Sequence, residues 1–466
     1  MTDKIDIEAA LRASLTEHAR HAPAAGVLAD RIIGYVDLLP PARERRLGRQ
    51  WRTWTLSLVA AGSMAAVAAA LVGVTQFRHN ADHKPPAVPI TSTAPTPMPS
   101  PTAPATRSTA PNPPPATHVT PKEVSLTHFQ AIDLTFVGTE NGWALGTADC
   151  LNGSGGPCAA MVRTTDGGAT WHGMKPPPAN VPLLVCAAPC IQHIRFATSQ
   201  IGYAWGPSAF FMTTDGGVNW QRQPGGADAL ETLDGNVIRV VDQAGGGCVP
   251  GCDYNVQTAP IGSATWRSID LPGTYDNGST TGVALVRVGN RAFIEVFGHP
   301  AGGGRDATSL LYTSTDDGMS WTRHGEPCPQ SPGHEADGSA IVAAADGSVV
   351  VLCVPRGAPA PSFTTVSSDG SAPFRASGPL PADAADSGLL GAASQQVQFV
   401  LSTTALYRSA DVGQTWQSVP AVTVGPGEPI FVGFESASVG RVVTDTGRAI
   451  WTTRNAGLTW TQHPFS

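Results

Sequence analysis

The sequence has few charged residues and no basic excess. Of its 466 residues, 14% are Asp, Glu, Lys or Arg, and the formal net charge is −7. Proteins that bind nucleic acid need clustered positive charge, so we do not expect a nucleic-acid partner. Cysteine is confined to one part of the chain, because all eight cysteines lie between Cys150 and Cys353.

Common motifs for phosphate, metal and nucleophilic chemistry are missing. The glycine runs at 245–247 and 302–304 lack the Lys-Ser/Thr pair that a phosphate-binding loop requires. The twelve histidines form no His-Glu-x-x-His segment, and the cysteines have no Cys-x-x-Cys spacing typical of zinc sites. No Gly-x-Ser-x-Gly elbow occurs. We therefore predict no cofactor, no metal site and no catalytic residue.

One segment recurs along the C-terminal three quarters of the chain. Its pattern is Ser/Thr-x-Asp-x-Gly-x-Thr-Trp, called the box below. The clear copies are marked by Asp166 and Trp171, Asp215 and Trp220, Asp316 and Trp321, Asp411 and Trp416, and Asn455 and Trp460. Degenerate copies at 258–266 and 367–374 fill the gaps and bring the number to seven. A period of roughly 40 to 55 residues is typical of a repeat architecture.

The composition of the box predicts a hairpin turn. A carboxylate accepts hydrogen bonds from N–H groups of its own turn, and glycine adopts positive φ without steric cost. The tryptophan is an apolar anchor for the turn, and the threonine beside it favours a strand. We interpret the box aspartates as turn-forming residues and not as catalysts or metal ligands.

The boxes resemble the BNR or Asp-box repeats of sialidases, sortilin-type receptors and Ycf48-like photosystem assembly factors. The last group also has a phrase like 136–146 (FVGTENGWALG), which is echoed at 196–206 (FATSQIGYAWG). The resemblance covers about 124–466, and it implies a fold more than a function. It does not imply a photosystem role.

An all-β ring of seven four-stranded sheets, a seven-bladed β-propeller, is the expected fold of 124–466. A six-bladed ring is the alternative if one degenerate copy is only a loop. Blade one is predicted at 131–137, 142–146, 160–165 and 170–174, and blade two at 193–197, 202–205, 209–214 and 219–222. Segments 282–289 and 291–298 open blade four, and 428–434 and 440–445 open blade seven.

The N-terminal part has the composition of a membrane anchor. Residues 53–77 carry no charge and are long enough to span a hydrocarbon core of ~30 Å. Five arginines lie at 43–52, whereas only Arg78 and Lys84 follow closely. The positive-inside rule then predicts a cytoplasmic tail at 1–52, a signal anchor at 53–77 and an extracellular C-terminal domain. Residues 78–123, rich in Pro, Thr and Ser, are predicted to be an extended linker.

The cysteines are predicted to form disulfides in an oxidising compartment. The expected pairs are Cys150–Cys158, Cys186–Cys190, Cys248–Cys252 and Cys328–Cys353. In a four-stranded blade these positions lie on or near the face opposite the boxes. Insertions on one face of a repeat protein often mark its binding face, so we predict that a ligand meets this face. Stabilised loops without a ligand are the alternative.

An enzymatic function of sialidase-like type is the alternative to a binding role. That family needs three arginines, a Tyr–Glu pair and an acid/base Asp. Its early Phe/Tyr-Arg-Ile-Pro phrase is missing here, and the nearest fragment, Phe374-Arg375, comes late. The tyrosines considered as nucleophiles are Tyr203, Tyr254, Tyr275, Tyr312 and Tyr407. We favour a non-catalytic binding or assembly module for a glycan or protein of the cell envelope over a glycoside hydrolase.

A thiol titration of the native, unreduced protein tests the disulfide prediction. We expect no reactive thiol before reduction and eight after reduction and unfolding, because eight cysteines on one side of a membrane span pair in an oxidising compartment. Eight free thiols in the native protein would contradict the predicted extracellular location as well.

Overall fold

The computed structural model describes residues 124–150, 157–182, 188–242, 254–272, 278–300, 310–328, 336–355, 361–384, 389–425, 430–444 and 447–465. All of them lie in the second of two compact units, Ala116–Ser466. The predicted tail, signal anchor and linker at 1–123 lie outside the described residues. Within the described part, no helix is long and apolar enough to cross a membrane.

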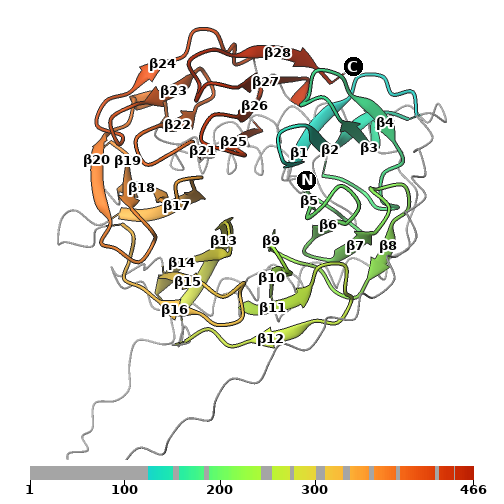
Figure 1. The fold of residues 1–466 in the computed structure, drawn as a ribbon, viewed down its shortest axis with the longest axis horizontal. Coiled ribbons are helices and arrows are strands. Elements are labelled where there is room, and N and C mark those ends of the chain that lie inside the picture. The colour runs from blue at the N-terminus through green and yellow to red at the C-terminus, as the bar shows by residue number, and fades with distance from the viewer. Residues whose placement is uncertain are drawn as a thin grey trace, which may run out of the picture. The chain divides into compact units, whose positions relative to one another are not determined.

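Seven four-stranded antiparallel sheets surround a central channel (Figure 1). Each sheet is formed by four consecutive strands, so the predicted seven-bladed propeller is confirmed. The first strand of each blade, such as β1 and β5, lines the channel, and the fourth lies at the rim. The degenerate copies at 258–266 and 367–374 both connect a third to a fourth strand, so the six-bladed alternative is wrong.

The strands of blades one to four are β1 (Gln130–Val137), β2 (Asn141–Asp149), β3 (Pro157–Thr164), β4 (His172–Met174), β5 (His193–Phe196), β6 (Gly202–Gly206), β7 (Ala209–Thr213), β8 (Gln221–Gln223), β9 (Ala229–Thr232), β10 (Asn236–Asp242), β11 (Tyr254–Pro260), β12 (Arg267–Ile269), β13 (Gly278–Val288), β14 (Arg291–Pro300), β15 (Leu310–Ser314) and β16 (Thr322–Arg323).

The strands of blades five to seven are β17 (Ala336–Ala343), β18 (Val349–Pro355), β19 (Phe363–Ser367), β20 (Arg375–Pro379), β21 (Leu389–Ala392), β22 (Gln398–Leu401), β23 (Leu406–Ser409), β24 (Gln417–Ser418), β25 (Phe431–Phe434), β26 (Gly440–Thr444), β27 (Ala449–Thr453) and β28 (Thr461–Pro464). One 3-10 turn, η1 (Ala382–Ala384), precedes β21. The observed bounds differ from the predicted ones by a few residues.

The start of the fourth strands was predicted too early. Thr170 was placed in a strand, but β4 begins at His172. The reason is that Thr170 donates both its N–H and its hydroxyl to the Asp166 carboxylate, at 3.0 and 2.5 Å, so it belongs to the turn. Asn219 is held by Asp215 in the same way, and β8 begins at Gln221.

The apolar core is divided among the blade interfaces. The described residues form seven buried clusters, one between each pair of neighbouring blades. Between blades one and two, for example, Trp143 stacks on Phe196 with ring centroids 3.8 Å apart. Each sheet is therefore buried on both faces, and removing one blade would expose two interfaces to water.

Small residues allow the aromatic side chains to pack tightly at these interfaces. A Cβ atom on Gly142 would lie 2.5 Å from Phe136, and one on Gly440 would lie 2.5 Å from Phe434. Gly202 has the same relation to Phe196, at 2.6 Å. In blades one, two and seven, a phenylalanine at or next to the end of the first strand therefore requires glycine at or next to the start of the second strand, which explains the repeated Phe-x5-Gly phrase.

The ring closes between blades seven and one without strand exchange. β1–β4 and β25–β28 each form a complete sheet of their own, so side chains hold the two blades together. Phe465 packs on Phe129 and Trp171, with ring centroids 5.5 and 5.0 Å away. Arg441 donates to the carbonyl oxygen of Thr139 at 2.8 Å.

Blade three lacks the box aspartate and is stabilised differently. Pro260 stands where the Asp belongs, and the Tyr203 hydroxyl of blade two accepts a hydrogen bond from the N–H of Gly262 in this turn at 2.9 Å. Trp266 packs under the Arg239 guanidinium, which lies 4.1 Å from its ring centroid. A cation over an aromatic ring replaces part of the missing hydrogen bonding.

Replacing Trp171 with alanine should destabilise the propeller by about 3–5 kcal/mol, because it removes a buried aromatic at the closing interface. Equilibrium unfolding in denaturant measures this change. Leu458→Ala is the matched control, since Leu458 is 69% exposed in the box of blade seven, and it should change stability by less than about 0.5 kcal/mol. Equal effects of the two substitutions would contradict the anchor role of the tryptophan.

Candidate functional site

The box aspartates hold their own turns. In blade one, Asp166 Oδ1 accepts hydrogen bonds from the Thr164 hydroxyl at 2.7 Å and from the N–H of Thr170 at 3.0 Å. The Gly168 N–H donates to the Thr164 hydroxyl oxygen at 3.0 Å, with Gly168 at φ 91°. Partial burial raises the pKa of Asp166, but hydrogen bonds from Thr170, Thr164 and Ala169 outweigh it and hold the value at about 2. The carboxylate is therefore ionised at neutral pH and surrounded by donors from its own turn.

The same contacts recur in the other clear boxes. In each of these boxes, the backbone N–H of the residue four positions later donates a hydrogen bond to the side-chain Oδ1 of the box residue. These box residues are Asp215, Asp316, Asp411 and Asn455. In blade seven the amide of Asn455 donates to the Thr459 hydroxyl at 2.9 Å, so the direction of that hydrogen bond is reversed relative to blade one. An amide thus satisfies the turn as well as a carboxylate does.

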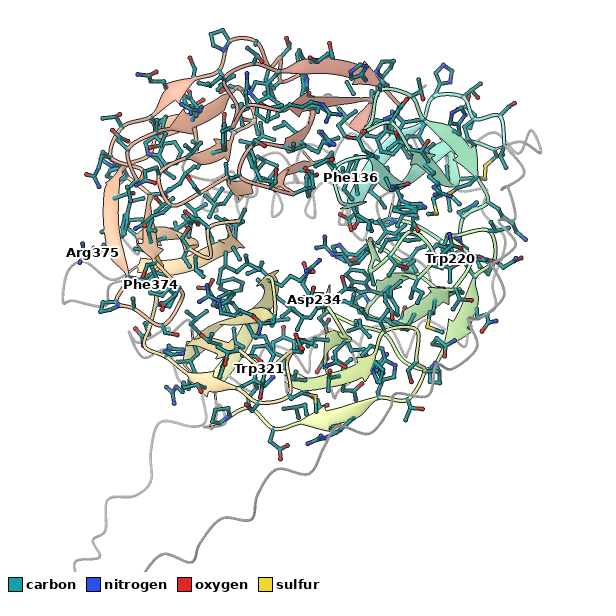
Figure 2. All side chains as sticks on the ribbon, viewed as in Figure 1. Phe136, Trp220, Asp234, Trp321, Phe374 and Arg375 are labelled. Atoms are coloured by element: carbon teal, nitrogen blue, oxygen red, sulfur yellow. A yellow bond between two sulfur atoms is a disulfide. The ribbon has the colours of Figure 1, made fainter. Side chains whose placement is uncertain are left out.

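The box tryptophans lie at the blade interfaces near the rim, as Figure 2 shows for Trp220 and Trp321. Trp171 and Trp460 donate their indole N–H to Gly168 and Gly457 of their own boxes, at 3.1 and 3.2 Å. In the described structure, the indole nitrogens of Trp220, Trp321 and Trp416 have no hydrogen-bond partner. These three side chains therefore contribute mainly through apolar packing.

Side chains of the preceding blade hold several box carbonyls. Trp143 donates to Gly216 at 3.2 Å, Arg291 to Asp369 at 3.1 Å, and Arg408 to Ala456 at 3.1 Å. Arg291 also donates to Gly347 at 2.9 Å. Contacts within and between blades therefore hold many of the polar groups of these turns.

A cavity of about 420 Å³ lies at one mouth of the central channel. Its lining residues come from the C-terminal halves of the inner strands and from the turns that follow them, such as Gly138 and Gly289. These turns adjoin the boxes, since the Gly167 N–H donates to the carbonyl of Glu140 and the Gly216 N–H to that of Gln200. The cavity therefore opens on the box face.

One wall of this cavity is charged. Arg195 on β5 forms an ion pair with Glu231 on β9, and Arg287 Nε on β13 lies 3.7 Å from Glu231 Oε2. The glutamate side chain is 7% exposed, whereas the arginines are 34% and 36% exposed. Two guanidinium groups share one carboxylate, so this wall, the arginine wall below, has a net charge of +1 and unused N–H donors.

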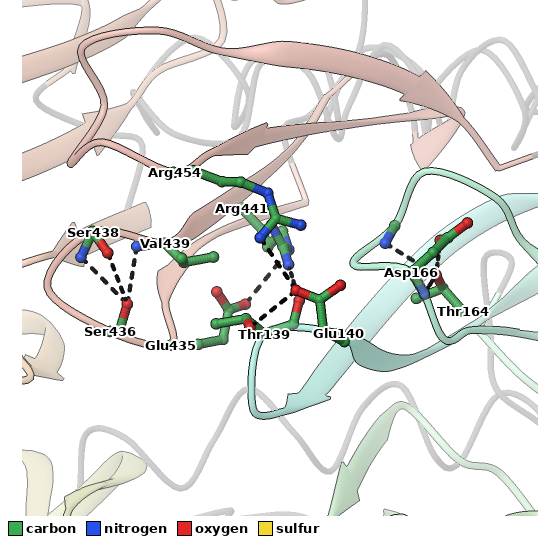
Figure 3. Close-up of polar contacts among 11 residues, drawn as sticks. Thr139, Glu140, Thr164, Asp166, Glu435, Ser436, Ser438, Val439, Arg441 and Arg454 are labelled. Carbon is green, nitrogen blue, oxygen red and sulfur yellow. Dashed lines mark hydrogen bonds and ion pairs between the residues drawn. The ribbon is translucent and has the colours of Figure 1, made fainter.

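The remaining walls include many residues with apolar side chains. They are formed by Leu134, Phe136, Val342, Ala343, Phe431, Val432 and Phe434, with two glycines, Gly391 and Gly433. Glu435, at the end of β25, is the acidic group on this side of the cavity among the described lining residues. Figure 1 shows β25 across the channel from β13, and Figure 3 shows Glu435 beside Arg441.

The structure has disulfides Cys150–Cys158 and Cys328–Cys353, two of the expected pairs. Cys190 also forms a disulfide, whereas Cys186, Cys248 and Cys252 lie outside the described residues. A second cavity, of about 340 Å³, lies in blade one beside Cys158 and is lined by residues such as Leu126 and Met174. It opens on the face opposite the boxes, where a ligand was predicted, and nothing further in the structure indicates an occupant.

Four of the five tyrosines considered as nucleophiles are described, and they lie away from the channel. None of the four belongs to an inner strand. Tyr203 lies on the second strand of its blade, and the other three lie on third strands: Tyr254, Tyr312 and Tyr407. The Tyr407 hydroxyl donates to Asp383 at 2.7 Å. Tyr275 and its surroundings at 273–277 are outside the described residues. The described cavity thus combines two arginines with glutamates but includes no tyrosine.

Arg195, Glu231, Arg287 and Glu435 were not predicted as site residues from the sequence. A comparison of the repeats at one position contained part of the information, since Glu435 follows Phe434 where Val137 follows Phe136 and Ala197 follows Phe196. The arginine wall had no such indication. Its three residues come together only when blades two, three and four stand side by side in the closed ring.

No family model and no curated protein matches the chain. Among solved structures it is similar to YCF48 bound to a D1 peptide, with 19% identity, 73% of this chain and 99% of that chain covered, and a TM-score of 0.45. It is also similar to virginiamycin B lyase from Staphylococcus aureus, with 10% identity, 71% of this chain and 97% of that chain covered, and a TM-score of 0.44. For the Hadza microbial sialidase Hz136, the identity is 12%, the coverage is 58% of this chain and 67% of that chain, and the TM-score is 0.39.

Two of these neighbours are enzymes by name, a lyase and a sialidase, whereas the third is YCF48 in complex with a peptide. Propellers of one architecture support unrelated functions, so function has to be argued from the site. At 19% identity or less, the similarity assigns no ligand or activity to this chain.

Substitutions at Asp166 test whether the box residue acts through its turn. Asp166→Asn should cost less than about 1 kcal/mol, because Asn455 already holds the equivalent turn, whereas Asp166→Ala should cost about 1–2 kcal/mol through the loss of several hydrogen bonds. Denaturant unfolding at neutral pH measures both changes. A larger loss for the asparagine variant than for the alanine variant would exclude this interpretation.

Proposed function

We propose that the chain is a non-catalytic binding module, anchored in the cell membrane with its propeller outside the cytoplasm. Its cavity at the channel mouth holds an anionic group of a glycan or protein of the cell envelope. The observation that carries this proposal is the arginine wall, in which two partly exposed guanidinium groups share one buried carboxylate.

The charges and donors of the arginine wall favour an anion. Each guanidinium has five N–H donors, and Glu231 can accept only some of them. Glu231 holds both arginines in place, so an anion that enters the cavity meets donors whose side chains are already ordered. Carboxylate, sulfonate and phosphate groups match the fork of an arginine.

The apolar walls favour a ligand whose anion is attached to a hydrophobic body. Phe136 on β1 and Phe431 and Phe434 on β25 line the cavity together with the arginine wall. A concave site that combines apolar side chains with a few placed polar groups is the usual form of a ligand pocket. The cavity has room for a group larger than a simple inorganic ion.

Binding without sialidase-like catalysis is favoured because the described residues that line the cavity include no tyrosine. A sialidase-like hydrolase would use the arginines to clamp a carboxylate, but it also needs a Tyr–Glu pair. The alternative function therefore shares the anion site and differs in the reacting groups.

The membrane anchor and the extracellular location rest on the sequence. The uncharged segment 53–77 follows five arginines, and the C-terminal part forms disulfides. The proposed cavity lies on the box face, whereas the loops predicted to bind a ligand on the opposite face include 151–156, 183–187 and 243–253, which are outside the described residues. The two faces are therefore separate locations to be tested.

Calorimetric titration of the full-length chain tests the arginine wall. The probe is naphthalene-1-sulfonate, a permanent monoanion with an apolar body, and the neutral comparison is naphthalene-1-sulfonamide. The sulfonate should bind at least about tenfold more tightly than the sulfonamide, and Arg195→Ala or Arg287→Ala should each remove about tenfold in affinity, or ~1.4 kcal/mol.

Arg222→Ala is the control, because Arg222 is exposed on the outer strand β8, and it should leave the affinity unchanged. Equal binding of the two probes, or an equal loss in the Arg222 variant, would contradict the proposed site. A panel of fluorogenic glycosides covers the alternative. Hydrolysis that disappears in the Arg195 and Arg287 variants would favour a glycoside hydrolase over a binding module.

A further inference from the structure

Glu435 is a buried carboxyl group in the wall of the proposed binding cavity. It follows the last residue of β25, and its N–H donates to the carbonyl of Val439 at 3.0 Å in the β25–β26 turn. Its side chain is 14% exposed and lines the cavity. In the described structure, Glu435 Oε2 has no hydrogen-bond partner.

The buried Arg441 is the nearest positive charge to Glu435, but it does not form a hydrogen bond with the Glu435 carboxylate. The Arg441 side chain is 0% exposed, and its Nε lies 3.8 Å from Glu435 Oε1, beyond hydrogen-bond distance. The guanidinium instead donates through Nη2 to Thr139 and lies 4.3 Å from the Phe136 ring centroid. The Nε and Nη1 atoms have no hydrogen-bond partner within the described residues.

The other charged groups near Glu435 are few. Arg454, after β27, pairs with Glu140 of the β1–β2 turn at 3.2 Å, and both side chains are about half exposed. Across the cavity is the arginine wall of Arg195, Glu231 and Arg287. Figure 3 shows the two arginine–glutamate pairs at the closing interface. Burial raises the pKa of Glu435 to about 7, although the charges of Arg441 and Arg454 act in the opposite direction.

We propose that Glu435 couples anion binding to proton uptake, so that a monoanion enters the cavity together with one proton on the Glu435 carboxyl group. This inference rests on the function proposed above. An ionised Glu435 would repel the anion that the arginine wall attracts, and like charges repel each other more strongly in a protein cavity than in bulk water. A protonated Glu435 is neutral, and its O–H becomes a donor for the ligand.

The proton comes from solvent, and no covalent bond of the ligand changes. The bound anion raises the proton affinity of Glu435 further, so ligand affinity is highest when the group is already protonated. Affinity is therefore full below the pH at which free Glu435 titrates, and it falls as the pH rises through that value. With up to one proton taken up per ligand, the affinity for a permanent monoanion falls by at most about tenfold per pH unit.

Calorimetry of the full-length chain with naphthalene-1-sulfonate at about pH 6 to 8.5 tests the coupling, because the probe itself does not titrate in this range. We expect the affinity to fall about tenfold over the range, and buffers of different ionisation enthalpy to report an uptake of up to one proton. Glu435→Gln should bind with an affinity that varies less than about twofold with pH and matches that of the unaltered chain at about pH 6.

Glu140→Gln is the matched control, because Glu140 lies at the same interface but is half exposed and outside the cavity lining. It should retain the pH profile of the unaltered chain. The proposal is overturned if the unaltered chain takes up no proton, or if Glu435→Gln keeps the slope. The proton count on the unaltered chain decides the question even if Glu435→Gln does not fold.

The result also separates this inference from the proposed function. Sulfonate binding that depends on Arg195 but not on pH would leave the anion site in place and exclude the role of Glu435. If the sulfonate does not bind at any pH in this range, both proposals are wrong.

Discussion

Closure of the ring is the constraint on which the rest of the structure depends. Every blade buries both of its faces, because the described core consists of seven clusters between neighbours. The seventh blade has to meet the first, and no strand crosses this interface. Apolar packing of Phe465 and the hydrogen bond from Arg441 to Thr139 therefore close the ring. The boxes make closure possible, since each one fixes a turn that the preceding blade contacts.

Closure also creates the candidate site. Arg195, Glu231 and Arg287 stand on inner strands of three successive blades, and they line one cavity only because these strands face the same axis. Glu435 enters the cavity from blade seven, next to the closing interface. The buried Arg441 serves both functions, because it holds Thr139 of blade one and lies behind the carboxyl group that faces the ligand cavity.

The sequence predicted the local structure well and the site poorly, for a physical reason. A box contains its own hydrogen-bonding partners, so Asp166 with Thr164 and Thr170 is recognisable from eight consecutive residues. Blade three was also found, although Arg239 and Tyr203 replace its aspartate through contacts that no single repeat contains. The arginine wall depends on long-range packing, and an arginine on an inner strand looks like any exposed arginine until the ring is closed.

The most direct test of this account is an experimental structure of the full-length chain with bound naphthalene-1-sulfonate. The account predicts a closed seven-bladed ring with the sulfonate at Arg195 and Arg287 on the box face and the naphthalene ring against Phe431 and Phe434. A ring that is open between blades seven and one would contradict it. So would a probe bound only on the opposite face, with the arginine wall covered by other side chains.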